Sequence, residues 1–279
     1  MWAMMQKFRI RAGSVKVVSA KVGIELLLAN GRYGIRPGRT RLMTHFVMRA
    51  AESHDDAHRY RWKMPETTHD ADGVIADLQR PDGPAAGVVV LAHGAGGNRT
   101  AVILRAVADE LCARGLVVAR IDLPYRQRRP KGPPSPSGAA ADRDGIRAAC
   151  AVFRGEANGP LIVGGHSYGG RQASMAVAED PDLADGLLLT SYPLHPPGKP
   201  DRMRTEHLPS ITVPTVIVHG STDPFASPTE LTDAAALIGA PVRIVEIEKV
   251  GHNLNPEKKP TAALTADAVD EVLLGRVRS

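Results

Sequence analysis

Residues 161–170 read LIVGGHSYGG, and this stretch decides the fold class. Its apolar start predicts a short buried strand, and the small residues that follow predict a sharp turn into a helix. Within the turn, Gly165, Ser167 and Gly169 have the Gly-x-Ser-x-Gly spacing of a nucleophile elbow. Glycines two residues before and after the serine let neighbouring backbone approach closely. We therefore predict an exposed serine on a strained strand-to-helix turn.

A serine at such a turn needs two partners to act as a nucleophile. Its hydroxyl needs a base at neutral pH, and the base needs an acid that orients it. In this arrangement the acid and then the histidine follow the serine along the chain, each in a loop after a strand. Asp223 follows the apolar run 213–219, and His252 follows the run 242–247. We predict Ser167, Asp223 and His252 as a catalytic triad.

Other titratable residues fit these roles less well. His93 and His166 flank the predicted site, and we expect both to be hydrogen-bonded structural residues. Three more lie in a Pro-rich excursion over 191–212 rather than in a loop after a strand: His195, Asp201 and His207.

The stretch LAHGAGGN, residues 91–98, supplies a candidate oxyanion hole. This Gly-rich turn ends an apolar run, so the backbone N–H groups of Ala95 and Gly96 can point toward the serine, with the N–H of Tyr168 as their partner. Losing one such donor typically costs about 3 kcal/mol. Phosphate-binding patterns fail here: Arg99 stands where a dinucleotide motif needs glycine, and no Gly-Lys-Ser/Thr follows.

Beyond the serine motif, strand and helix patterns alternate from residue 73 onward. This alternation predicts an α/β fold: a mostly parallel, doubly wound sheet flanked by helices. The expected strands are 73–78, 86–92, 116–121, 161–163, 186–190, 213–219 and 242–247. Helices are expected over about 103–111, 146–153, 168–179, 229–237 and 264–272. Cys112 and Cys150 fall on apolar helix stripes, which predicts buried thiols.

The net charge of +5 is unevenly distributed along the chain. Residues 1–50 carry ten basic residues and one acidic residue, so the remainder has a net charge of −4. We expect residues 1–65 to form a basic, poorly structured segment and residues 66–279 to form the folded domain. Met43 is an available alternative start, which leaves open whether residues 1–42 belong to the native protein. No nucleic-acid binding is expected of the acidic body.

Two features bear on location and metals. The apolar stretch 22–29 is far shorter than the ~20 residues that span a bilayer, and it makes a poor secretory signal. With only two cysteines, this favours a cytoplasmic protein without a membrane span. His54 and His58 have the i, i+4 spacing of metal ligands but no third ligand nearby, so we expect neither a metal nor a cofactor.

Two loops are expected to reach the carboxyl ends of the strands, where substrates bind in open α/β sheets. The loop over 124–137 is basic and has no acidic residue, and the excursion over 191–212 is too short for a helical cap. We name five of their residues as a candidate substrate rim: Arg126, Arg128, Arg129, His195 and His207. A basic rim would favour acidic acyl groups or an acidic partner, whereas a solvated loop is the simpler alternative.

Together these motifs resemble the α/β-hydrolase superfamily over residues 73–275. The stretches at 93–97, 164–171, 206–209, 219–225 and 251–253 carry the resemblance, and SYPLHPPGKP at 191–200 is its most specific part. More narrowly, the chain resembles the branch of testis-expressed protein 30 and KAT8 regulatory NSL complex subunit 3, whose bacterial relatives are called dienelactone-hydrolase-like. Dienelactone hydrolases use a cysteine nucleophile, and Ser167 departs from that pattern.

The resemblance implies an eight-stranded-type sheet and hydrolase chemistry, in a branch that has no well-defined substrate, and the short excursion predicts no large cap. From the residues we expect a serine hydrolase that acts on a small carboxylic ester, lactone or thioester through an acyl-enzyme. A non-catalytic scaffold on the same fold is the alternative, since the chromatin-complex member of the branch resembles one and fold does not fix function. The sequence sets no oligomeric state.

Overall fold

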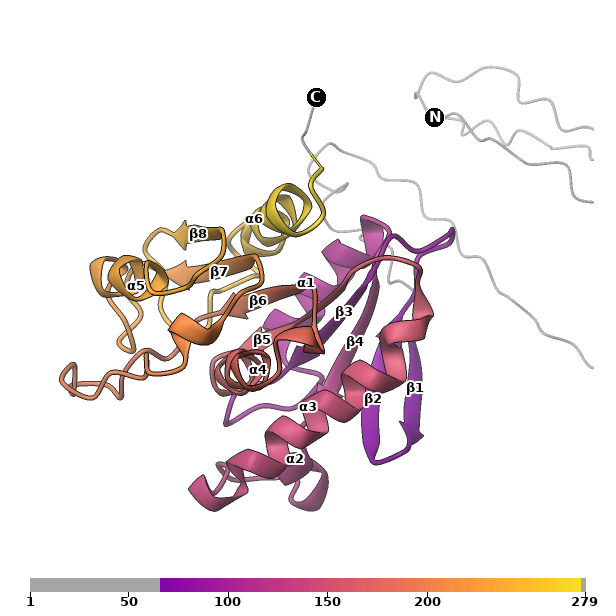
Figure 1. The fold of residues 1–279 in the computed structure, drawn as a ribbon, viewed down its shortest axis with the longest axis horizontal. Coiled ribbons are helices and arrows are strands. Elements are labelled where there is room, and N and C mark those ends of the chain that lie inside the picture. Colours follow the sequence, from indigo (N-terminus) through magenta and orange to yellow (C-terminus); the bar gives the residue numbers. More distant parts are fainter. Residues whose placement is uncertain (1–65, 277–279) are drawn as a thin grey trace, which may run out of the picture. The chain divides into compact units, whose positions relative to one another are not determined.

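The structure, a computed structural model, describes residues 66–276 and contains one eight-stranded sheet (Figure 1). The strands are β1 (Glu66–Ala71), β2 (Val74–Gln79), β3 (Val88–Ala92), β4 (Val117–Asp122), β5 (Leu161–His166), β6 (Gly186–Thr190), β7 (Thr215–Gly220) and β8 (Val242–Ile247). Their order is β1-β2-β4-β3-β5-β6-β7-β8. The six strands from β3 to β8 are mutually parallel, and β1 and β2 are antiparallel additions at one edge.

Helices cover both faces of the sheet, because the central strands are apolar on both sides. The helices are α1 (Val102–Ala113), α2 (Pro124–Arg128), α3 (Ala139–Phe153), α4 (Tyr168–Glu179), α5 (Pro228–Ala235) and α6 (Thr261–Ala268), which continues as a π turn over Val269–Leu273. Buried residues of α3, α4 and α5 pack on one face, and those of α1 and α6 pack on the other (Figure 1). The predicted doubly wound α/β architecture is confirmed.

Two elements differ from the sequence prediction. Strand β1 was missed because its residues ETTHDA are polar and mostly exposed. It pairs with β2 through a turn at Asp72 and Gly73, whose φ angles of 56° and 73° are those of a tight hairpin turn. The predicted loop over 124–137 also contains α2, which begins with proline at its first position.

A buried arginine attaches β1 to the body of the sheet. Arg120 on β4 is fully buried, and its guanidinium bonds to the Glu66 carboxylate and, at 2.7 Å, to the Arg99 carbonyl. The Glu66 side chain is 30% exposed, and Asp77 Oδ2 lies 4.0 Å from the same guanidinium, so two carboxylates balance the buried charge of Arg120. The predicted N-terminal segment, with His54 and His58, lies outside the described residues.

The two cysteines lie on opposite faces of the sheet, Cys112 on α1 and Cys150 on α3, and both are buried. Burial raises the pKa of Cys112 to about 11 and that of Cys150 to about 12. Both are therefore protonated thiols that serve packing, as predicted.

Over residues 66–276 no helix is long and apolar enough to cross a bilayer. The same part of the chain holds no group of three His, Cys, Asp or Glu residues placed to bind a metal ion.

Candidate active site

Ser167 occupies the turn between β5 and α4 in a conformation that serine seldom adopts. Its φ is 52° and its ψ is −116°, and its N–H donates to the Thr190 carbonyl at 2.8 Å. Backbone packs against backbone here: a Cβ on Gly165 would lie 2.1 Å from the Ala92 oxygen, and one on Gly169 would lie 2.6 Å from it. The turn is thus a strained strand-to-helix elbow of the kind that the glycine spacing predicts.

The structure brings the three predicted triad residues together at the carboxyl ends of their strands. His252 lies in the loop after β8, and its Nε2 is 2.7 Å from Ser167 Oγ. Its Nδ1 is 2.8 Å from Oδ2 of Asp223, which lies in the turn after β7. The Asp223 carboxylate is inaccessible to solvent, whereas the His252 side chain is 26% exposed. Asp201, the weaker alternative, is exposed in the excursion.

Asp223 is held ionised and correctly oriented. Burial opposes its ionisation, but hydrogen bonds from His252 and from the Phe225 N–H outweigh that effect, so the pKa of Asp223 lies below its usual value. The Phe225 N–H donates to Oδ1 at 3.0 Å, which leaves Oδ2 for the imidazole. The carboxylate therefore favours the His252 tautomer with hydrogen on Nδ1, so that Nε2 accepts from Ser167.

Two neighbours fix the position of the His252 loop and ring. Ser191, directly after β6, donates from Oγ to the His252 carbonyl at 2.8 Å and adopts a φ of 49°. The Phe225 ring lies 4.3 Å from the imidazole, centroid to centroid. Ser191 belongs to the distinctive 191–200 stretch, but its spacing from His252 in sequence gave no sign of this contact.

The other histidines near the site are structural, as predicted. The pKa of His166 is lowered to about 4 by burial and then by its neighbour His252, so its ring is neutral at pH 7. His93 is buried, and burial lowers its pKa as well. Its Nδ1 donates to the Gly94 carbonyl at 2.9 Å, while Nε2 accepts from the Leu123 N–H at 3.2 Å. His252 is therefore the candidate base of this site.

The turn after β3 lies against the elbow and orients its peptide groups. A Cβ on Gly94 would lie 3.4 Å from Ser167 Cβ. The Tyr125 hydroxyl is 3.1 Å from the Gly94 oxygen and 2.9 Å from the Ala95 oxygen, so both carbonyls face Tyr125. Because a trans peptide directs its C=O and N–H oppositely, the N–H groups of Ala95 and Gly96 point away from Tyr125.

Tyr168 offers the third donor predicted for the oxyanion hole. It is the first residue of α4, and the first N–H groups of a helix have no intrahelical acceptor. The donors at Ala95, Gly96 and Tyr168 thus belong to two backbone segments that meet beside Ser167.

Asp142, a residue that no sequence motif singles out, connects these two segments. It is completely buried on α3; its Oδ1 accepts from the Tyr125 N–H at 3.0 Å and its Oδ2 from the Tyr168 hydroxyl at 2.7 Å. The two tyrosine rings also pack edge to face at 5.9 Å. An acidic residue in the first turn of a helix predicts only a favourable interaction with the helix dipole, so no sequence pattern indicates this role.

The candidate rim residues separate into two groups. The rim interpretation is wrong for Arg126: it is 6% exposed, and its guanidinium donates to the backbone carbonyls of the 95–97 turn and of residues 129 and 132. His195 is buried, and its Nε2 lies 3.4 Å from Glu230 Oε2. His207 Nε2 forms a hydrogen bond of 2.8 Å with Ser174 Oγ on α4. Arg128 and Arg129 are exposed, as a rim requires.

The half-buried His207 makes stability depend on pH. Burial, and then the positive charge of Arg171, lower the pKa of His207 to about 4. The unfolded chain, with a histidine pKa near 6.5, therefore binds protons that the folded chain does not, and stability falls as the pH drops from about 6.5 toward 4. The free energy of unfolding can be measured by urea titration at pH 7.5 and at pH 5.0. Between these pH values it should fall by about 1 kcal/mol less in His207→Gln than in the unmodified protein, after allowance for the partial exposure of His207. Equal losses would contradict this role.

Comparison with known proteins identifies the family. The sequence pattern of the alpha/beta hydrolase domain matches residues 85–273, most of the chain. The protein belongs to this family. The site of the hydrolase domain, at the carboxyl ends of its strands, is where ligands bind in open α/β sheets.

Solved structures confirm the fold of the hydrolase domain. A dienelactone hydrolase from Anabaena variabilis superposes with a TM-score of 0.60 at 21% identity, covering 77% of this chain and 100% of that one. Est1E from Butyrivibrio proteoclasticus gives 0.56 at 17% identity, with coverages of 74% and 96%. An α/β serine hydrolase without lid from Xanthomonas campestris gives 0.54 at 16% identity, with coverages of 75% and 93%. The predicted α/β-hydrolase fold without a large cap is thus correct.

Proposed function

We propose that this protein is a serine hydrolase of small carboxylic esters, with lactones and thioesters as related substrates. The observation that carries the proposal is the unbroken hydrogen-bond chain from Ser167 Oγ through His252 to the buried Asp223 carboxylate. Est1E, which shares the fold, has been solved with ferulic acid bound, so a site on this architecture can hold a small carboxylic acid.

The reaction would proceed in two acyl transfers. His252 Nε2 takes the proton of Ser167 as Oγ attacks the substrate carbonyl, and the N–H groups of Ala95, Gly96 and Tyr168 stabilise the oxyanion. The imidazolium then gives its proton to the departing alcohol, which leaves an ester on Ser167. In the second half His252 removes a proton from water, the hydroxide attacks the acyl-enzyme, and Ser167 recovers its proton as the acid leaves. Asp223 stabilises the imidazolium in both halves.

The proposal also includes the branch of the family to which the chain is assigned and the boundary of the hydrolase domain. We place the chain in the branch of testis-expressed protein 30 and KAT8 regulatory NSL complex subunit 3 on the strength of the 191–200 stretch, where Ser191 contacts the His252 loop. We propose residues 66–279 as the hydrolase domain and residues 1–65 as a separate basic segment; the ion pair between Glu66 and the buried Arg120 supports that boundary. The cytoplasmic location stays a prediction.

Active-site labelling tests the function directly. A fluorophosphonate probe should label the protein, and Ser167→Ala should abolish labelling and lower kcat for 4-nitrophenyl butyrate about 10⁶-fold, since removing the nucleophile of such a triad costs about that much. Ser210→Ala, which alters an exposed serine outside the elbow, should leave both unchanged. A folded protein that neither reacts with the probe nor hydrolyses short esters would instead be the non-catalytic scaffold.

A further inference from the structure

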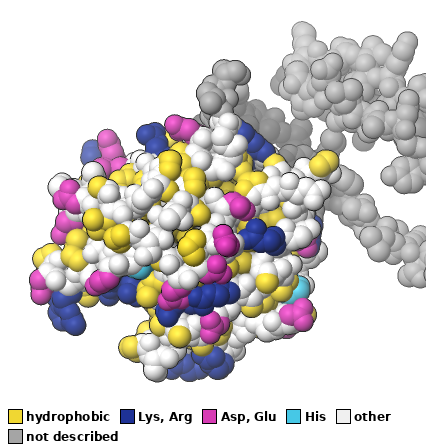
Figure 2. Space-filling model, in the orientation of Figure 1, with side chains coloured by type: hydrophobic (Ala, Val, Ile, Leu, Met, Phe, Trp, Pro, Cys, Tyr) yellow, Lys and Arg dark blue, Asp and Glu magenta, His cyan; other side chains and the backbone are white. Residues whose placement is uncertain are grey.

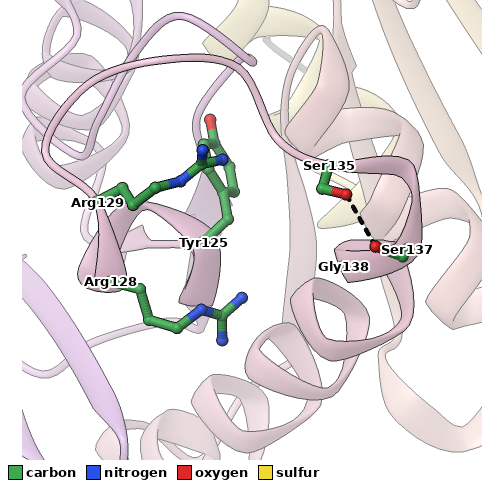
Figure 3. A pocket seen from close by; sticks show the side chains of 6 residues that line it. All are labelled: Tyr125, Arg128, Arg129, Ser135, Ser137 and Gly138. Carbon is green, nitrogen blue, oxygen red and sulfur yellow. Dashed lines mark hydrogen bonds between the residues drawn. The ribbon is translucent and has the colours of Figure 1, made fainter.

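A basic cavity of about 370 Å³ lies beside α2, within the size range of small-molecule sites. Its walls are formed by Tyr125, Arg128, Arg129, Ser135, Ser137 and Gly138. Figure 3 shows the two arginine side chains extending from the end of α2 toward the segment that carries the two serines. Lysine and arginine side chains also gather at the lower edge of the molecule in Figure 2, where Figure 1 places α2.

The charge of this cavity is not neutralised from within. No acidic residue lines it, and over residues 66–276 neither Arg128 nor Arg129 forms an ion pair. Arg129 donates to the Pro133 carbonyl at 2.9 Å, which uses one of its five N–H groups. Two guanidinium groups therefore keep most of their donors for a ligand.

The backbone that carries Arg128 and Arg129 is held in place without a ligand. The buried Arg126 guanidinium donates to the Arg129 carbonyl at 3.2 Å and to the Gly132 carbonyl at 3.1 Å, and its Nε donates to the Gly97 carbonyl at 2.7 Å. This fixes the backbone after α2 relative to the turn beside Ser167. A preorganised site spends less binding energy on ordering its own residues.

The opposite wall adds neutral donors that suit an anion. Ser135 Oγ and Ser137 Oγ lie 2.8 Å apart, so their shared hydrogen bond leaves one hydroxyl hydrogen to donate elsewhere. Gly138 precedes α3, a 15-residue helix whose start has no side-chain cap. A Cβ on Gly138 would lie 4.0 Å from Arg128 Nη2, so the guanidinium lies near the start of α3, the positive end of its dipole.

Tyr125 joins this cavity to the candidate active site. Its ring lines the cavity, while its hydroxyl contacts the Gly94 and Ala95 carbonyls of the candidate oxyanion loop. Tyr168, which follows Ser167, packs edge-on against the same ring at 5.9 Å. A ligand in the cavity would thus touch a residue that also shapes the oxyanion loop.

We propose that this cavity binds an anionic group, a carboxylate or a phosphate, carried by the ester that Ser167 attacks. The proposal rests on the proposed hydrolase function and names its substrate class. The planar guanidinium groups of Arg128 and Arg129 can each bond two oxygens of such a group, and the serine hydroxyl supplies a further donor. The substrates would be half-esters of diacids or phosphate-bearing esters, rather than simple neutral esters.

Matched esters test the proposal. The 4-nitrophenyl monoester of glutaric acid and its phosphonate analogue are compared with the methyl-capped glutarate, which has the same chain, one additional methyl group and no charge. The butyrate ester of 4-hydroxybutanoic acid and its methyl ester place the charge on the alcohol side. Each is assayed with the unmodified protein, with Arg128→Gln/Arg129→Gln, and with Arg105→Gln/Lys131→Gln, which changes the net charge equally at exposed residues outside the cavity.

The unmodified protein should prefer a charged ester over its capped partner, and the cavity variant should reduce that ratio of kcat/KM about tenfold, or about 1.4 kcal/mol. The control pair should keep the preference, and hydrolysis of the capped ester should not change. No preference in the unmodified protein, or an equal loss in both variants, overturns the proposal. If no ester is hydrolysed the function itself fails, and calorimetry with glutarate and inorganic phosphate decides: saturable binding that the cavity variant loses supports the site, and its absence refutes it.

Discussion

Replacing Asp223 by asparagine should lower kcat for a 4-nitrophenyl ester about 10⁴-fold while the protein stays folded. The asparagine fills the same volume at the end of β7, but its neutral amide no longer stabilises a charged imidazole and can favour the wrong His252 tautomer. Because the Asp223 side chain is fully inaccessible to solvent, buffer anions cannot take its place. KM should change little, since Asp223 does not face the substrate.

Asp201→Asn is the matched control, because Asp201 is the carboxylate that sequence alone offers as an alternative. It is exposed in the excursion, so its loss should change kcat less than twofold. Circular dichroism and urea titration of both variants separate a catalytic defect from misfolding. A large loss for Asp201→Asn together with a small one for Asp223→Asn would refute the assignment.

Replacing Gly165 by alanine should destabilise the domain by about 4 kcal/mol, much of the 5–15 kcal/mol that typically holds a domain together. Gly165 has a φ of 153°, a region that a side chain rarely enters. A methyl group there would lie 2.1 Å from the Ala92 oxygen, a backbone atom of β3, the strand that pairs with β5 at this position. Neither strand can move without disturbing the central sheet, so strain and overpacking act together.

Urea denaturation and soluble yield measure this effect. Gly155→Ala is the control, because a Cβ at Gly155 meets no atom within 4 Å. It should change stability by less than about 1 kcal/mol. If Gly165→Ala unfolds at the same urea concentration as the control, the close approach of β5 and β3 at the elbow is not a structural requirement.

Local patterns in the sequence were sufficient to predict the parallel part of the sheet and to name three candidate triad residues that the structure brings together. Ser167 and Asp223 each follow an apolar strand, whereas His252 follows the edge strand β8, which includes Arg243 and Glu246. All three strands are parallel, so the three residues lie at the same edge of the sheet. The polar strand β1 carries no such pattern, and only the Asp72-Gly73 turn signals its hairpin.

Contacts between distant segments could not be predicted. The three arginines and one lysine of residues 124–137 look equivalent in sequence. In the structure, however, Arg126 is buried among backbone carbonyls, whereas Arg128 lines a cavity. The difference depends on how α2 packs against the 95–97 turn, 29 residues earlier in the chain. Asp142 was missed for the same reason, since its two tyrosine partners lie 17 and 26 residues away.

The strained backbone conformations of the described domain are concentrated around the site. Six residues other than glycine have positive φ, and five of them lie in the elbow, directly after β6 or in the loop after β8: Ser167, Ser191, Lys249, Leu254 and Asn255. Each such conformation costs on the order of 1–3 kcal/mol, which the relaxed remainder of the sheet must offset. The elbow, the residue after β6 and the loop after β8 therefore affect both the thermal stability of the domain and the geometry around His252. Selection for one of these properties also acts on the other.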